Sequence, residues 1–118
     1  MPNPVVHFEI MGGEGAALVD FYAGTFGWEI DAANPMNYGL VPAAEGGIGG
    51  GVGPAMDGKP FVTVYIQVDD LAKALEAVEA GGGTTLMPPT EVMPGGPNIA
   101  LFNDPAGNRV GLVLARPS

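Results

Sequence analysis

His7, the only histidine of the chain, lies in the apolar stretch VVHFEI, and Glu9 follows two residues later. The alternation of this stretch predicts a β-strand, and a strand places residues i and i+2 on the same face. An imidazole beside a carboxylate can hold a metal ion, act as a general base or hydrogen-bond a bound molecule. The structural alternative is a core histidine that is satisfied by its neighbours. The chain has no cysteine and a single serine, Ser118, so a catalytic triad around His7 has no nearby nucleophile in the sequence.

Composition restricts the class of partner. Among 118 residues, 13 are acidic and 4 are basic, which gives a net charge of −9. Nucleic acids and anionic membrane surfaces require a basic face, so we expect neither as a partner. No apolar run approaches the roughly 18 residues of a membrane-spanning helix, and no signal-peptide pattern opens the sequence. Together with the lack of cysteine, these features favour a cytoplasmic protein.

The order of predicted elements repeats once along the chain. The first half predicts a strand at 5–11, a helix at 16–26, a strand near Trp28, a strand at 37–41 and a glycine-dense strand or loop at 47–53. The second half predicts a strand at 61–68, a helix capped by Asp69 or Asp70 and ended at 81–83, and strands at 84–87, 98–102 and 109–114. We therefore predict one α+β domain over 1–118, with module one at about 4–54 and module two at about 60–115.

In the first strand of each module, alternate residues are expected to face the helix. The residues between them form the other face, and their polar and aromatic side chains suit the lining of a cleft. The glycine-dense stretch GGIGGGVG fails the spacing of a nucleotide-binding loop, so we expect it to permit close backbone approach instead. Flat rings and thioethers from other elements can add apolar contacts to such a cleft. The candidate ligand-binding residues are His7, Glu9, Tyr38, Phe61, Tyr65, Gln67, Met93 and Phe102, with His7 and Glu9 also the candidate catalytic pair.

The segment FYAGTFGW closes the first helix of this paired βαβββ order, and the segment NDPAGNRVGLV stands at its end. In this order they resemble the vicinal oxygen chelate superfamily, which includes glyoxalase I, the bleomycin-resistance proteins and the extradiol dioxygenases. The stretch VTVYIQVDDLAKALEAVEAGG is similar to the start of the second module in small members. The resemblance covers about Pro4 to Leu114. It implies two βαβββ modules that form a cupped, eight-stranded mixed sheet with helices on the outside, and it implies a homodimer.

Enzymes of this superfamily hold a divalent metal, which acts as a Lewis acid, at four ligand positions that usually carry His, Glu or Gln. Transferred to this sequence, the resemblance places the first position at His7, which matches. The other three fall on Tyr65, on Gly111 and in the glycine stretch 47–53, where no usual ligand stands. Such a site needs three or four protein ligands. We therefore expect no cofactor, although a divalent metal held by His7 with irregular partners stays open.

The resemblance and the missing ligands favour a metal-independent binding protein of the glyoxalase/bleomycin-resistance type. It would capture a hydrophobic or aromatic small molecule in the cleft between the modules, with the Tyr65 ring in the volume that a metal would fill. The alternative is a divalent-metal-dependent lyase, isomerase or dioxygenase that uses His7. A third interpretation is a metal-free enzyme with His7 or Glu9 as the base.

Overall fold

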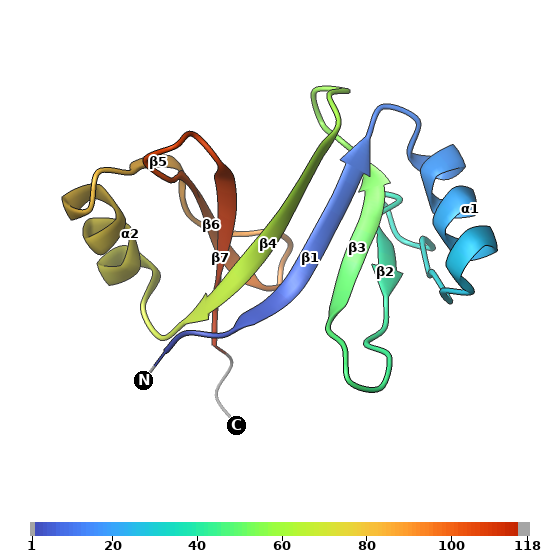
Figure 1. Ribbon diagram of the computed structural model, residues 1–118, viewed down its shortest axis with the longest axis horizontal. Coiled ribbons are helices and arrows are strands. Elements are labelled where there is room, and N and C mark those ends of the chain that lie inside the picture. Colours follow the sequence, from blue (N-terminus) through green and yellow to red (C-terminus); the bar gives the residue numbers. More distant parts are fainter. Residues whose placement is uncertain (1, 116–118) are drawn as a thin grey trace. The chain divides into compact units, whose positions relative to one another are not determined.

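The computed structural model describes residues 2–115, which divide into two compact units (Figure 1). The N-terminal unit comprises residues 7–63, and the C-terminal unit comprises residues 64–115 together with 2–6. The division falls within the strands β1 (Val5–Gly12) and β4 (Phe61–Val68). No helix among residues 2–115 is long and apolar enough to cross a membrane.

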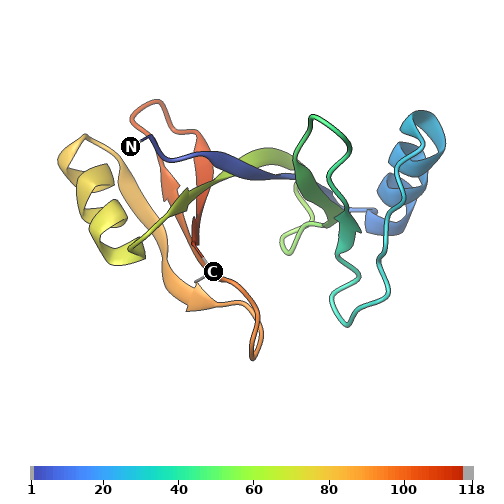
Figure 2. The ribbon, with the colours of Figure 1, turned by 90° about the horizontal axis from the view of Figure 1, so that it is seen from below.

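In the N-terminal unit, β1 is followed by helix α1 (Gly15–Phe26) and by strands β2 (Gly39–Val41) and β3 (Gly49–Pro54). The central strand is β3, which runs parallel to β1 and antiparallel to β2. Helix α1 packs against β3, and Figure 2 shows the long connection that returns from α1 to β2. This register places His7 opposite Gly49 and Glu9 opposite Gly51.

The glycines of β3 allow aromatic rings to lie directly on the strand. A methyl carbon added at Gly50 would overlap the ring of Phe8, and one added at Gly51 would overlap the ring and hydroxyl of Tyr38. Neighbouring strand residues point to opposite faces, so the two rings cover the two faces of β3. On the helix side, Phe8 also contacts Trp28, with ring centroids 5.5 Å apart. The glycine run therefore serves close approach by side chains of the same chain.

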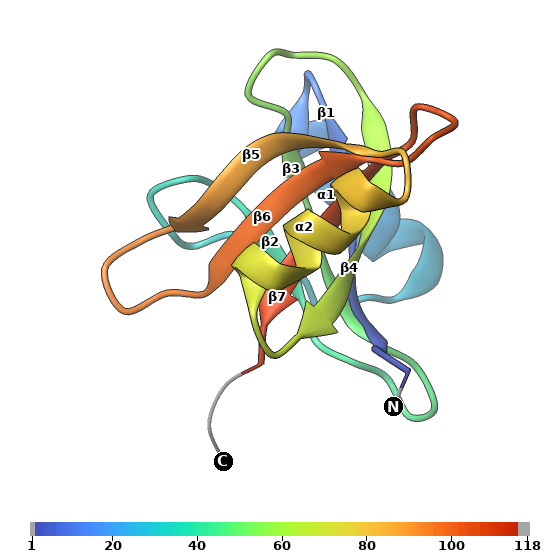
Figure 3. The same ribbon diagram turned by 90° about the vertical axis from the view of Figure 1, so that its left-hand side faces the viewer.

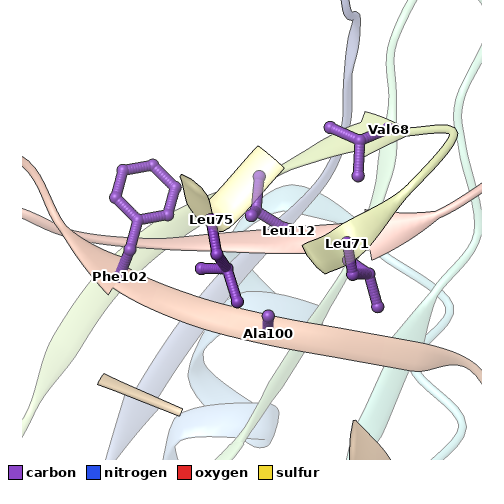
Figure 4. Packing of buried hydrophobic residues seen from close by; sticks show 6 residues of the cluster. All are labelled: Val68, Leu71, Leu75, Ala100, Phe102 and Leu112. Atoms are coloured by element: carbon purple, nitrogen blue, oxygen red, sulfur yellow. The ribbon is translucent and has the colours of Figure 1, made fainter. Parts of the chain in front are cut away.

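The C-terminal unit contains β4, helix α2 (Leu71–Ala80), β5 (Thr84–Glu91), β6 (Asn98–Asn103) and β7 (Arg109–Leu114), with the strand order β4-β7-β6-β5. Strands β4 and β7 are parallel, and the other neighbours are antiparallel. The side chain of Asp70 caps α2 by accepting a hydrogen bond from the Lys73 backbone N–H at 3.0 Å. Helix α2 covers one face of the strands (Figure 3), and its apolar stripe packs there on β6 and β7 (Figure 4).

The α+β class with one helix in each half is confirmed, whereas the strand expected near Trp28 does not form. Only Asp31 and Leu40 form an isolated bridge there, with N···O distances of 3.0 and 2.8 Å. Pro35 has no N–H to donate and Asn37 takes a left-handed backbone (φ 53°), so the chain turns before further residues can pair. Residues 2–115 thus hold seven named strands, three of them in the N-terminal unit. The cupped arrangement and the single domain over 1–118 stay predictions.

Strand β5 is longer than the predicted 84–87. It continues through Pro88 and Pro89 with two register irregularities against β6. The edge position of β5 in its unit explains this tolerance, because an edge strand has backbone N–H groups that need no partner within the sheet. The proline-rich segment is therefore a loop only beyond Glu91.

Candidate functional site

Three polar side chains of the N-terminal unit form a hydrogen-bonded group. The Tyr38 hydroxyl donates to Glu9 Oε2 at 2.9 Å, and His7 Nε2 lies 2.8 Å from the same hydroxyl oxygen. With the hydroxyl proton directed to Glu9, the matching tautomer of His7 carries its proton on Nε2 and donates to Tyr38. The His7 and Tyr38 rings are nearly coplanar, with 12° between their planes and 6.3 Å between centroids. We call these three residues the His7 group.

Asn34 fixes the backbone of Tyr38. Its side-chain oxygen accepts from the Tyr38 backbone N–H at 3.0 Å, and its side-chain nitrogen donates to the Tyr38 carbonyl at 2.7 Å. The left-handed Asn37 directly before Tyr38 completes this turn. The ring of Tyr38 then lies over Gly51, where only a glycine leaves room for it. Local turn bonds and a distant glycine thus hold one hydroxyl between His7 and Glu9.

Burial controls the electrostatics of His7. The side chain is half-buried, and the cost of desolvating the charged imidazolium lowers the pKa of His7 below its usual value. A histidine with a lowered pKa is neutral at pH 7. The neutral ring suits the proton arrangement described above, in which Nε2 donates to Tyr38.

An open hollow of about 700 Å³ lies beside the His7 group in the same unit. Its walls come from β1, from the segment before β2, and from the β2–β3 hairpin. Most of the lining is apolar or glycine, and two acidic side chains are part of it. The lining residues are His7, Glu29, Ile30, Asp31, Leu40, Val41, Pro42, Ala43, Gly49 and Gly50. This volume is within the usual range for a small-molecule site.

Of the candidate residues, the structure brings together His7, Glu9 and Tyr38. Phe102 is 9% exposed and belongs to the cluster that packs against α2, so little of its surface is left for a ligand. Met93 lies exposed after β5. Three further candidates belong to β4, where Tyr65 is buried while Phe61 and Gln67 are half-buried. A cleft between the modules stays a prediction.

The four metal-ligand positions that the resemblance implies occupy matching places in the two units. His7 pairs with Gly49 between parallel strands, and Tyr65 pairs with Gly111 in the same way. The ring of Tyr65 lies on Gly111, where a methyl carbon would overlap it. Among residues 2–115 no group of three or more His, Cys, Asp or Glu side chains could hold a metal ion. Of the four positions that the resemblance implies, only the one at His7 carries a usual ligand side chain.

The sequence-based candidates do not include the apolar residues that line the hollow or three of its polar contributors, Asn34, Glu29 and Asp31. Asn34, which fixes Tyr38, has a signal in the sequence NPMNY, because asparagines beside proline are typical of turns stabilised by side chain to backbone bonds. Glu29 and Asp31 line the hollow, but the sequence assigned their segment to a strand that does not form. No spacing rule connects these residues to His7, since the connection arises only when the segment folds back onto β2.

Comparison with known proteins agrees with this fold. The sequence model of the Glyoxalase/Bleomycin resistance protein/Dioxygenase superfamily matches residues 5–112. The chain belongs to this superfamily. A solved structure of a hypothetical protein from Bacillus halodurans superposes on it with a TM-score of 0.72 at 12% identity, over 100% of this chain and 98% of the other. At this identity the likeness concerns the fold alone.

Several sequence relatives align over most of the chain, and two of them illustrate the range of lengths. Anthracycline biosynthesis protein DnrV of Streptomyces peucetius is 31% identical over 90% of this chain, which corresponds to 45% of the relative. A glyoxylase-like domain-containing protein of Didymella fabae is 32% identical over 88% of this chain and 91% of the relative. The chain thus spans about half the length of DnrV, but nearly all of the Didymella protein.

Proposed function

We propose that this protein binds a hydrophobic or aromatic small molecule, without a resident metal, in the hollow beside the His7 group. The observation that carries the proposal is the Tyr38 hydroxyl, which engages His7 and Glu9 at 2.8 and 2.9 Å next to an open hollow. Polar groups that already satisfy one another can border an apolar site without a penalty for unpaired burial. The apolar lining then supplies the binding energy, and His7 supplies a polar contact that orients the ligand.

The hydrogen bonding of His7 argues against metal ligation by Nε2. That nitrogen carries a proton and donates it to Tyr38, and a metal ligand must be unprotonated at the coordinating nitrogen. Binding a cation at this nitrogen would require breaking the hydrogen bond between His7 and the Tyr38 hydroxyl. The other positions of the expected ligand set, Tyr65, Gly111 and the stretch 47–53, carry no usual ligand side chain.

The sequence relatives are compatible with a flat, apolar ligand. DnrV is named for anthracycline biosynthesis, and anthracyclines are polycyclic aromatic molecules. Because the chain corresponds to only part of DnrV, the ligand of the whole relative is only a guide. Aromatic molecules as a class fit the apolar lining of Leu40 and Pro42 beside the His7 ring.

Proton transfer is the second candidate function. His7 is neutral through its lowered pKa, lines the hollow and connects through Tyr38 to the carboxylate of Glu9. A neutral imidazole backed by a carboxylate can accept a proton from a bound substrate. Turnover of a bound molecule in EDTA, abolished in His7→Gln, would support this base. A metal-dependent lyase, isomerase or dioxygenase would instead require added divalent metal.

A thermal-shift screen of small aromatic molecules in EDTA tests the proposal. The single histidine makes each hit easy to locate, because its ring protons give one set of NMR signals. We expect hits to shift these signals and to bind Leu40→Gln more weakly. The matched control is Leu86→Gln, since Leu86 has similar exposure, 48% against 51% for Leu40, but does not line the hollow. Equal weakening in both variants would place the ligand elsewhere.

We further propose that the protein acts in the cytoplasm as a homodimer. The lack of cysteine supports the first point, and the family resemblance supports the second. Size-exclusion chromatography with light scattering measures the oligomeric state directly. A mass of one chain, 12.0 kDa, would contradict the dimer.

A further inference from the structure

The charges on the hollow select among apolar ligands. Glu29 and Asp31 are the acidic side chains of its lining, and no lysine or arginine of residues 2–115 is part of it. The remaining titratable group is His7, which the lowered pKa keeps neutral at pH 7. An occupant of the hollow therefore meets apolar surface together with two negative charges.

The position of Asp31 is fixed by the backbone. Its N–H and C=O pair with those of Leu40 at 3.0 and 2.8 Å, and its Oδ1 accepts a hydrogen bond from the Ala33 backbone N–H at 2.9 Å. Leu40 itself lines the hollow, so the carboxylate of Asp31 and an apolar contact surface are held side by side. Glu29, two residues before Asp31, lies exposed at the same wall.

The unit around the hollow strengthens this field. Residues 7–63 contain seven acidic residues and one basic residue, Lys59, which gives a net charge of −6 with His7 neutral. The whole chain carries −9, so two thirds of the excess negative charge lies in about half of the residues. A cleft with low-dielectric walls and charge of one sign raises the local concentration of oppositely charged ligands.

We infer that the ligand of the hollow is an apolar or aromatic molecule that carries a protonated amine, with the ring against Leu40 and Pro42 and the amine at Glu29 and Asp31. This inference rests on the proposed function and specifies its ligand class. The apolar part contributes most of the affinity, and the two carboxylates provide discrimination in favour of cations.

Two probes of equal shape test the inference by calorimetry in EDTA: 1-naphthylmethylamine, which is protonated at pH 7, and 1-naphthylmethanol, which is neutral. We expect the amine to bind about fivefold tighter, since each partly solvated charge pair contributes about 0.5 kcal/mol. The preference should shrink as the salt concentration rises. In a Glu29→Gln/Asp31→Asn double variant the two probes should bind equally. The amide oxygen introduced at position 31 can still accept from the Ala33 N–H, so the local fold is retained.

The control variant is Glu76→Gln, which removes one exposed charge on α2, outside the hollow. It should keep the preference for the amine. A preference that survives the double variant would contradict the inference, because the discrimination would then come from the general charge of the protein. Equal binding of both probes, weakened together by Leu40→Gln, would overturn the cationic class and leave the proposed function standing. Absence of binding by either probe would also overturn the inference, while the aromatic screen tests the proposed function separately.

Discussion

Gly51→Ala should disrupt the His7 group although it adds a single methyl group. The new carbon would occupy space held by the ring and hydroxyl of Tyr38, so the ring must leave its place on β3. Both hydrogen bonds of the hydroxyl are then lost, at about 1 kcal/mol each. Overpacking of the strand adds a cost of similar size, so we expect the free energy of unfolding to fall by about 2–4 kcal/mol.

The matched control is Gly24→Ala in α1, where an added methyl group meets no atom within 4 Å. Alanine is the better helix former, so this variant should gain about 0.5–1 kcal/mol. Urea unfolding followed by the fluorescence of Trp28, the only tryptophan, measures both variants. In Gly51→Ala we also expect the pKa of His7 to rise towards its usual value, because removal of the Tyr38 ring exposes it to water. An unchanged stability and an unchanged His7 titration in Gly51→Ala would refute the placement of Tyr38.

Three further predictions concern single groups. Tyr38→Phe keeps the ring but removes the hydroxyl between His7 and Glu9. It should lower the free energy of unfolding, measured in urea, by about 1–2 kcal/mol. A loss below about 0.3 kcal/mol would contradict a bridging role of the hydroxyl. The pKa of His7 is lower in the folded state, so the unfolded state binds more protons below about pH 6.5. The wild type should therefore lose more stability than His7→Gln as the pH falls from about 7 to about 5. Equal stability profiles of the two proteins against pH would contradict the buried, neutral ring. Asp70→Ala should lower the free energy of unfolding by about 1 kcal/mol because it removes the cap of α2. Asp69→Ala should change it by less than about 0.5 kcal/mol. Equal effects of the two substitutions would contradict the assignment of the cap to Asp70.

Elements with strong local signals could be predicted from the sequence. The stripe of Leu71, Leu75 and Val78 after the capping Asp70 predicted α2, and the structure buries this stripe against β6 and β7. Alternation in VVHFEI likewise predicted that His7 and Glu9 share a face, and both reach the Tyr38 hydroxyl. In these cases the period of the pattern equals the period of the element, so local information suffices.

Long-range contacts account for what the sequence did not predict. The hydroxyl of Tyr38 contacts His7 and Glu9, which precede it by 31 and 29 positions in the sequence. The place of its ring depends on Gly51, whose missing side chain carries no periodic signal. Phe102 had the chemistry of a cleft residue, but the strand register turned it towards α2. The sequence of the segment after α1 predicts a strand, whereas the turn at Asn37 allows only one bridge to form.

The most direct test of the account is calorimetric titration of an aromatic ligand, identified in the screen, into protein kept in EDTA. We expect saturable binding of one molecule per chain, the same affinity after metals such as Zn²⁺, Ni²⁺ or Mn²⁺ replace the chelator, and weaker binding to Leu40→Gln. Binding that appears only after a divalent metal is added would contradict the proposal, because the ligand would then require a metal.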